Sequence, residues 1–467
     1  MKKIAVIYGQ LEHEIQKTAL GELSKILLDY TLEYPTCLKY SEDLKLSPYQ
    51  VIIYLGTKEN NPYIQKSSPA VLSQEEQYFL QVENNTVLIE GYDDAGVLYG
   101  VVDFYHKYIG GFEYPGNSRY WINPFEKETL PDFSYSSCPS VRERGLWTWG
   151  HVIYDYRGYL DNMMRLKLNR VIIWNDYAPV NAAEIVAYAH ARNIAVIWGF
   201  SWLWDTGFAN LDLNHLEGES ERILEKYERE YAGIGGDGIY FQTFTELRQD
   251  NLGGVLIAEA AAAFVNRTAA LFFEKYPDIK IQFGLHATSV KTRLEYLRAV
   301  DPRIRIVWED CGSLPFSYGP QDIRGFEETK RFVQTIAHLR GEDDCFGVVT
   351  KGLTKLDWSQ FEHMTGPQVL GVSSEGMKEN RIARKHRIWR FIQAYWLIHA
   401  DKVYEMVQEM CRLKEGDLCI AALLEDGMFE ENIMYPVALY AEMLWDCHAD
   451  IKTLMKDVAL RNYVIFA

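Results

Sequence analysis

Short apolar segments alternate with helical segments over the middle of the chain, and this alternation constrains the fold more than any other feature. The apolar segments have the length of β-strands and recur eight times, at residues 144–149, 170–175, 195–202, 238–245, 280–286, 305–309, 345–350 and 369–373. Strands that alternate with helices indicate βαβ units and a parallel sheet. Eight such units match an α/β fold of the (β/α)8 TIM-type barrel class, which takes roughly 250 residues.

A doubly wound open sheet is the competing topology for the same alternation. An open nucleotide-binding sheet places a glycine-rich phosphate turn directly after its first strand. No such turn follows residues 144–149. We therefore expect the closed barrel.

The chain of 467 residues is too long for one ordinary core and predicts three parts. Residues 1–135 read as an N-terminal α+β domain, with strands at 3–8 and 51–55, a hairpin over 79–90 and a helix at 95–108. A stretch rich in Pro, Ser, Asn and Gly, 115–139, reads as the linker. The barrel is expected over 136–380. Apolar residues at three- and four-residue spacing predict a C-terminal helical region over 381–467.

Net charge and cysteine content indicate which kinds of binding partner and which cellular compartment to expect. The formal net charge of −17 disfavours nucleic acid, because a phosphate backbone needs a basic surface. The start of the chain lacks a signal-peptide core, and no uncharged apolar run approaches the ~18–20 residues of a membrane span. Seven cysteines without a Cys-x-x-Cys pair indicate thiols in a reducing compartment. We expect a cytoplasmic protein with no nucleic-acid or membrane partner, and the apolar C-terminal helices are compatible with a homodimer.

Two carboxylates at strand ends are the strongest catalytic candidates, since a barrel carries its active site at the carboxyl ends of its strands. Glu246 follows the fourth strand and Glu309 ends the sixth. Glycosidic cleavage needs one acid to protonate the leaving oxygen and a second carboxylate as nucleophile, base or orienting group. Carboxylates at strand ends also serve as helix caps and ion-pair partners, which is the structural alternative. We expect Glu246 to be the general acid and Glu309 its partner.

Other side chains at the strand ends are expected to bind substrate. Polar groups there would hydrogen-bond sugar hydroxyls, and flat aromatic rings would stack on pyranose rings, although both also occur as caps and core fillers. These candidates are Trp149, His151, Asn175, Asp176, Trp202, Trp204, Tyr240, His286 and Trp308. The histidines are dispersed, and the sequence lacks a phosphate loop and a Gly-x-Ser-x-Gly motif. We therefore expect neither a metal nor a cofactor.

Several segments carry a family resemblance. They are residues 72–78 (LSQEEQY), 87–91 (VLIEG) and 93–100 (DDAGVLYG), and in the barrel Arg144-Gly145, 159–169 (YLDNMMRLKLN) and 184–194 (EIVAYAHARNI). Together they resemble glycoside hydrolases that join a family 20b-type N-terminal domain to a catalytic barrel, a group with β-N-acetylhexosaminidases, α-glucuronidases and α-N-acetylglucosaminidases. The resemblance covers about the first 200 residues. It implies a carbohydrate substrate, with Arg144 as a ligand of sugar hydroxyls.

The catalytic strand departs from that family. Family 20 enzymes carry an adjacent Asp-Glu pair there, whereas this chain reads Phe244-Thr245-Glu246, so Glu246 matches the acid and Thr245 replaces the orienting Asp. The leading prediction is a hydrolase of amino-sugar glycosides, with an α-glucuronidase-like hydrolase and a non-catalytic carbohydrate-binding barrel as alternatives. Carboxyl groups about 5–10 Å apart across the mouth favour catalysis. A Glu309 held in a salt bridge favours the binding protein.

Overall fold

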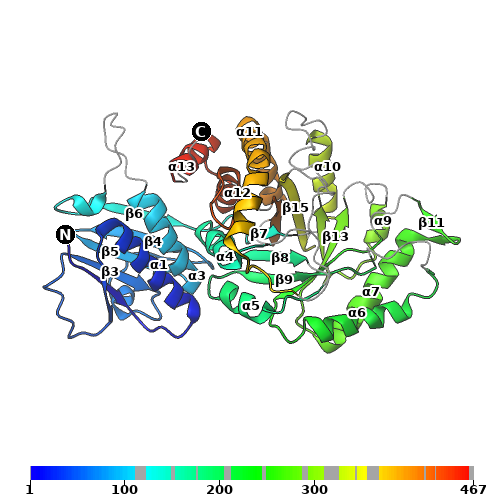
Figure 1. The fold of residues 1–467 in the computed structure, drawn as a ribbon, viewed down its shortest axis with the longest axis horizontal. Helices are drawn as coiled ribbons and strands as arrows, with labels where there is room; N and C mark the ends of the chain where they lie inside the picture. The colour runs from blue at the N-terminus through cyan, green and yellow to red at the C-terminus, as the bar shows by residue number, and fades with distance from the viewer. Residues whose placement is uncertain are drawn as a thin grey trace.

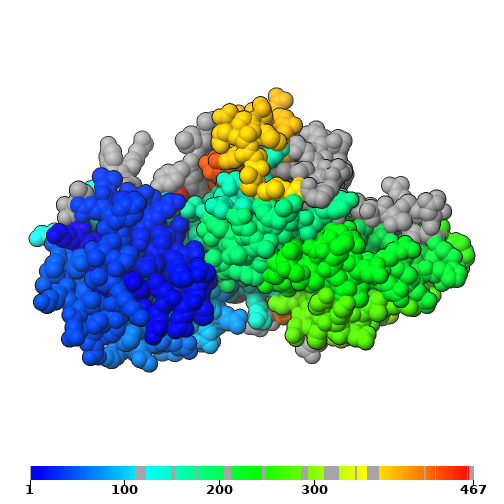
Figure 2. Space-filling model, turned by 60° about the horizontal axis from the view of Figure 1, so that its bottom comes forward, coloured from blue at the N-terminus to red at the C-terminus, as the bar shows by residue number. Residues whose placement is uncertain are grey.

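The structure is a computed structural model. It describes residues 2–110, 123–148, 153–174, 177–203, 212–244, 249–286, 293–309, 326–341, 344–354, 368–414, 417–425 and 428–461, with only the backbone at 286 and 460. The N-terminal part forms one lobe, and the rest of the chain forms a second lobe beside it (Figures 1 and 2). No helix in these ranges is both long enough and apolar enough to cross a membrane.

The N-terminal lobe is a mixed six-stranded sheet in the order β2-β1-β3-β5-β4-β6. The β4–β5 hairpin turns at Asn84 and Asn85, both with positive φ (49° and 62°), as a tight two-residue hairpin requires. Strands β2 and β6 are two additions that the sequence pattern did not predict; β6 lies in the expected linker and pairs with β4. The elements are β1 (Ile4–Tyr8), α1 (Glu14–Thr31), β2 (Thr36–Lys39), β3 (Val51–Gly56), α2 (Pro62–Ser67), β4 (Tyr78–Glu83), β5 (Thr86–Gly91), α3 (Asp94–Asp103), the π-helix η1 (Phe104–Ile109), η2 (Pro124–Glu126) and β6 (Phe133–Ser137).

The second lobe is a closed barrel of eight parallel strands, which confirms the expected fold class. Its strands are β7 (Glu143–Trp147), β8 (Arg170–Trp174), β9 (Ala195–Gly199), β10 (Gly238–Phe241), β13 (Ile281–His286), β14 (Arg305–Glu309), β15 (Phe346–Leu353) and β16 (Leu418–Leu424). A small hairpin, β11 (Asn251–Leu252) and β12 (Val255–Leu256), stands outside the barrel. The helices are α4 (Tyr156–Arg165), α5 (Ala182–His190), α6 (Glu217–Glu230), α7 (Ile257–Lys275), α9 (Leu294–Leu297), α10 (Phe326–Ile336), α11 (Glu375–Leu413), α12 (Tyr435–Trp445) and α13 (Ile451–Arg461).

The eighth strand is not where the sequence pattern placed it. β16 spans Leu418–Leu424 and closes the barrel between β15 and β7, whereas residues 369–373 form only an isolated bridge between Val372 and Asp155. The 39-residue helix α11 connects β15 to β16 and stands out from the barrel in both views (Figures 1 and 2). The barrel therefore continues past residue 380, and the part expected to be wholly helical contains its last strand.

Alternation along each strand decides which side chains enter the barrel. One buried cluster fills the interior, and a much larger one lies between the strands and the helices. Because side chains of a strand alternate between its faces, neighbours in sequence belong to different clusters. The interior cluster is Trp147, Ile172, Trp174, Ile197, Tyr240, Val307, Val349, Ala421 and Leu423.

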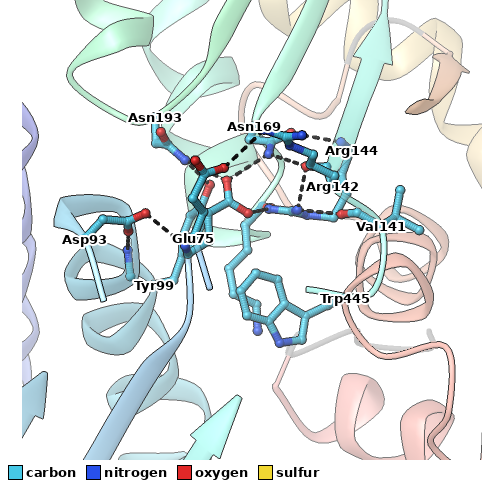
Figure 3. A network of polar contacts seen from close by, with 12 residues as sticks. Glu75, Asp93, Tyr99, Val141, Arg142, Arg144, Asn169, Asn193 and Trp445 are labelled. Carbon is cyan, nitrogen blue, oxygen red and sulfur yellow. Dashed lines mark hydrogen bonds and ion pairs between the residues drawn. The ribbon is translucent and has the colours of Figure 1, made fainter. Parts of the chain in front are cut away.

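A network of polar contacts that includes Arg144, Asn169 and Asn193 joins the N-terminal lobe to the barrel (Figure 3). Glu76 Oε2 accepts a hydrogen bond from Arg144 Nη2 on β7 at 2.7 Å. Its Oε1 accepts from the side-chain amides of Asn169 and Asn193, each at 2.9 Å. The Arg144 guanidinium also lies 5.1 Å from the ring centre of Trp445. The two lobes thus meet through a neutralised ion pair whose polar atoms are satisfied.

The core of the N-terminal lobe continues into the second lobe. Trp445 of α12 and Met164 of α4 belong to the same buried cluster as the side chains of the N-terminal sheet. Next to them, Lys167 Nζ lies 2.8 Å from Asp103 on α3 and 3.5 Å from Glu442 on α12. Buried charges persist when they are paired, as these are. We conclude that the lobes are joined by a shared core as well as by polar contacts.

A Glu76→Gln variant tests the contribution of this junction to stability. The amide keeps the shape of the side chain but leaves the buried Arg144 without its counter-charge, so the free energy of unfolding should fall by about 3 kcal/mol. Urea denaturation followed by circular dichroism measures the change. The adjacent Glu75→Gln is the matched control, because Glu75 is 71% exposed and lies 3.4 Å from an exposed Arg142; it should change stability by less than about 0.5 kcal/mol. Equal effects of the two variants would contradict this role of Glu76.

Candidate active site

Glu309, the last residue of β14, lies inside the barrel at the carboxyl ends of the strands. The side chain is only 1% exposed. Tyr240 Oη and Gln242 Nε2, from β10 and the residues after it, both donate to Glu309 Oε1. Lys351 Nζ on β15 lies 3.5 Å from Oε2. All three neighbours carry hydrogen-bond donors, and the Glu309 carboxyl group accepts from two of them.

A glycine makes room for this arrangement. A Cβ placed on Gly284 of β13 would overlap Tyr240 Oη and Glu309 Oε1, and it would come within 2.7 Å of Tyr240 Cζ. β13 lies between β10 and β14 in the barrel, so any side chain pointing inward from Gly284 would stand between the two partners. The Tyr240–Glu309 hydrogen bond therefore depends on glycine at position 284.

Aromatic rings border the same group of polar side chains. Lys351 Nζ lies 4.3 Å from the ring centre of Trp147. The rings of Trp147 and Trp174 have their centres 5.6 and 6.2 Å from that of Tyr240. A carboxylate, an ammonium, a phenol and two indoles thus meet at the carboxyl end of the barrel interior. We call Glu309, Tyr240, Gln242, Lys351 and Trp147 the Glu309 cluster.

A second buried carboxylate at this end of the barrel was missed by sequence reasoning. Glu425 follows β16 directly and is 3% exposed. Its Oε1 accepts from Lys385 Nζ of α11 at 2.8 Å, and its Oε2 accepts from Thr354 Oγ1 at 2.9 Å. The sequence did contain the signal, an apolar run of seven residues ending in a carboxylate. That run was assigned to a helix, so Glu425 was not recognised as a strand end.

The opposite end of the barrel interior is closed by an ion network. Glu143, the first residue of β7, contacts the guanidiniums of Arg170 on β8 and Arg305 on β14, and Arg305 also reaches Asp417 at 3.0 Å. Burial alone would raise the pKa of Glu143, but the two guanidiniums outweigh it and lower the pKa to about 2. The network therefore stabilises the barrel with an ionised Glu143.

The stability contributed by Glu143 should depend on pH. Its folded-state pKa lies below the ordinary value of 4.5, so this contribution is complete above about pH 4.5 and is lost as the pH falls toward 2. A shift of this size corresponds to about 3 kcal/mol. Denaturant unfolding between pH 6 and pH 2.5 should show a smaller loss of stability in Glu143→Gln than in the wild type. Parallel curves for the two proteins would contradict the assignment, and the exposed Glu225→Gln should follow the wild type.

Arg144 does not bind substrate at the mouth, contrary to what the family resemblance implied. It is 1% exposed, near the start of β7, and its guanidinium donates to Glu76 and to the backbone oxygens of Val141 and Lys167 at 2.7–3.0 Å. The next inward-facing residues on this strand are Gly145 and Trp147, so Arg144 points away from the barrel interior. Its role is to join the two lobes.

Two of the expected aromatic ligands face the helix layer. Trp202 is 0% exposed and stacks on Phe241, with ring centres 3.7 Å apart, and on Phe272 of α7. Trp308 is also 0% exposed and packs on Phe332 of α10 at 4.7 Å. Trp308 precedes the inward-facing Glu309, so alternation turns it outward. The expectation that these two rings line the mouth is wrong, whereas Tyr240 does lie in the barrel interior beside Glu309.

Several candidates lie outside the described residues. The chain is described up to Phe244 after β10, so Thr245 and Glu246 fall beyond it. His286 ends β13 and pairs in register with Glu309, but only its backbone is described. The other candidates beyond the described residues are Trp149, His151, Asn175, Asp176 and Trp204.

Within the described ranges no metal cluster competes with the Glu309 cluster, and two large cavities lie away from it. No group of three or more His, Cys, Asp or Glu side chains there is placed to hold a metal ion. One cavity of about 1030 Å³ lies between the N-terminal lobe and α11, bordered by Tyr105, His106 and Trp389. Another of about 960 Å³ lies at the amino ends of the strands, bordered by Glu143, Arg170 and Gln282. Neither cavity is bordered by Glu309, and active sites of this fold lie at the other end of the strands.

Comparison with known proteins identifies the fold of this chain but not its family. No protein-family model matches the sequence, and a search of curated proteins gives no match. Solved structures do match. CpGH84B has a TM-score of 0.56 at 13% identity, over 98% of this chain and 70% of that one. A β-N-acetylhexosaminidase from Bacteroides fragilis NCTC 9343 has a TM-score of 0.53 at 13% identity, over 96% and 88%.

A third similar structure is that of a glucuronidase. The family GH115 4-O-methyl-α-glucuronidase BtGH115A, with specificity for decorated arabinogalactans, has a TM-score of 0.55 at 14% identity. The alignment covers 99% of this chain but only 60% of that enzyme. The fold neighbours are thus glycoside hydrolases of more than one family. This chain has their fold: a parallel eight-stranded barrel with an N-terminal α/β lobe.

Proposed function

We propose that the chain is a glycoside hydrolase that acts on amino-sugar glycosides, with Glu246 as general acid and Glu309 as the partner carboxylate. The observation that carries the proposal is the Glu309 cluster: a carboxylate at the carboxyl end of a barrel strand, accepting from Tyr240 and Gln242. Chemistry on this fold is done at that end. The fold neighbours support the reaction class, and one of them is a β-N-acetylhexosaminidase.

The contacts of Glu309 support its proposed role as the partner carboxylate. A carboxylate that accepts hydrogen bonds and faces an ammonium can attack an anomeric carbon, activate a water or stabilise a positive transition state. We assign Glu309 this role because its carboxyl group already accepts from Tyr240 and Gln242. The acid role then falls to Glu246, which follows β10, the strand that also supplies Tyr240. Thr245 stands before Glu246, so Glu309 would take over the support that the orienting Asp gives in family 20.

A non-catalytic carbohydrate-binding barrel is the second candidate, and two observations favour it. Lys351 lies 3.5 Å from Glu309, and Glu309 is 1% exposed. A buried ion pair of this kind also occurs as a purely structural feature. In such a protein the aromatic rings near the mouth would bind a sugar without cleaving it. An α-glucuronidase-like activity remains the alternative within the enzyme class, and BtGH115A is a fold neighbour with that activity.

Hydrolysis of nitrophenyl glycosides tests the proposal. The panel comprises N-acetylglucosaminide, N-acetylgalactosaminide, glucuronide and glucoside, each in both anomeric forms. We expect turnover on an N-acetylhexosaminide and a loss on the order of 10³-fold in Glu246→Gln. The exposed Glu225→Gln on α6 is the matched control and should retain wild-type turnover. Turnover on the glucuronide alone would favour the α-glucuronidase-like alternative, and saturable sugar binding without product would favour the binding protein.

A further inference from the structure

Two thiols lie together at the junction of α11 and the segment after α12, away from the Glu309 cluster. Cys411 is in the last turn of α11, and Cys447 follows α12 by two residues. Tyr404 Oη of α11 donates to the backbone oxygens of Asp446 and Ala449 at 3.0 and 2.7 Å, and Gln408 Nε2 donates to that of Cys447 at 3.0 Å. Positions 404, 408 and 411 lie on one face of the helix. This face is turned toward residues 446–449, so Cys411 lies beside the segment that carries Cys447.

The surroundings give the two thiols different reactivity. The neighbouring Cys411 lowers the pKa of Cys447, with help from Ser140 and from the imidazole of His448, whose Nε2 lies 3.6 Å from Sγ. Cys447, together with burial, raises the pKa of Cys411. The thiolate is the nucleophilic form of cysteine, and a neighbouring thiol resolves the first oxidation product. Cys447 is therefore suited to react first and Cys411 to complete a disulfide.

We propose that Cys411 and Cys447 form an oxidisable dithiol that a peroxide converts to a disulfide. The Cys447 thiolate attacks one peroxide oxygen, the O–O bond breaks, and the leaving hydroxide takes a proton to become water. The sulfenic acid on Cys447 is then attacked by Cys411 Sγ, which forms the S–S bond and releases a second water with the Cys411 proton. Two thiols lose two electrons, and one peroxide is reduced to two waters.

The disulfide would link α11, which precedes the last barrel strand β16, to the segment after α12, which follows it. The chain between Cys411 and Cys447 contains β16 and α12, so the disulfide closes a loop around the strand that completes the barrel. Cross-linking residues that are already in contact stabilises a fold mainly by restricting the unfolded chain. The oxidised protein should therefore resist heat better than the reduced one, without a rearrangement of the barrel.

Peptide mapping of the native protein tests the proposal. The full chain is treated with hydrogen peroxide, alkylated with iodoacetamide and digested without reductant. We expect a cross-linked peptide pair containing Cys411 and Cys447, lighter by two hydrogens than the separate peptides, while Cys37 and Cys138 are alkylated. Cys138 is the matched control: it lies near Asp446, but burial raises the pKa of its thiol. Alkylation of both Cys411 and Cys447 after peroxide would overturn the proposal, as would over-oxidation of Cys447 beside an alkylated Cys411.

Single variants give a second readout. Peroxide should raise the unfolding temperature of the wild type and of Cys138→Ser by on the order of 5 °C. It should not raise that of Cys411→Ser or Cys447→Ser. In Cys411→Ser, dimedone should trap a sulfenic acid on Cys447, because the resolving thiol is gone. A temperature shift that persists in Cys411→Ser would exclude the disulfide as its cause.

Discussion

A Glu309→Gln variant is expected to lose turnover by on the order of 10³-fold on the best aryl glycoside, with a smaller change in KM. The amide keeps nearly the same shape, but it cannot act as a nucleophile or base and carries no charge for the transition state. The measurement is kcat and KM at the pH of maximal activity. If Glu309 serves only the structure, kcat of the folded variant should instead match that of the wild type.

The same substitution also disturbs an ion pair, and that effect must be separated from catalysis. Glu309→Gln removes the carboxylate that neutralises Lys351, a side chain that is 2% exposed. Loss of one partner of a buried pair destabilises a protein by about 3–5 kcal/mol. We therefore expect the single variant to unfold at lower denaturant concentration. Replacing both partners with uncharged residues of similar volume should recover most of that stability.

A Gly284→Ala variant is expected to reduce turnover by about 10²-fold while keeping the Glu309 carboxyl group. The added Cβ would overlap both partners of the Tyr240–Glu309 hydrogen bond, so one of them must move. Overpacking of this kind costs about 1–3 kcal/mol of stability. Misplacement of a reacting group by about 1 Å also costs about 10²-fold in rate. Steady-state kinetics and denaturant unfolding measure the two effects.

The control for this variant is Gly218→Ala on α6. A Cβ at Gly218 meets no atom within 4 Å, and alanine is the better helix former. It should unfold at an equal or slightly higher denaturant concentration and keep full activity. Wild-type turnover in Gly284→Ala would show that the Tyr240–Glu309 contact has no part in catalysis.

The sequence predicts the fold class well because the barrel strands are short apolar runs with helices between them. Seven of the eight strands lie where this pattern places them, from β7 to β15. The eighth, LCIAALL, is rich in leucine and alanine and lies between the helices α11 and α12. A short apolar run cannot be assigned to strand or helix by its period alone. The pattern instead predicts a strand at residues 369–373, because valines followed by a serine pair are also typical of a strand end.

The sequence predicts the residues of the candidate site less completely than the fold. The face on which a side chain lies and the exact end of a strand decide which residues belong to the site. Glu309 was found from its place at a strand end, but its neighbour Trp308 was assigned to the same face. Alternation excludes that, since successive side chains of a strand point to opposite faces. Lys351 was missed because the seventh strand was ended at 350, whereas β15 runs to Leu353. Arg144 was misassigned because its partner, Glu76, is distant in sequence.

The most direct measurement is kcat/KM of the double variant Glu309→Gln/Lys351→Met, with its unfolding free energy measured in parallel. The double variant removes the buried ion pair as a unit, so it should be as stable as the wild type to within about 2 kcal/mol. A catalytic Glu309 predicts that this stable protein has lost turnover by on the order of 10³-fold. A stable double variant with wild-type kcat/KM would contradict the catalytic role and leave Glu309 as a structural ion-pair partner.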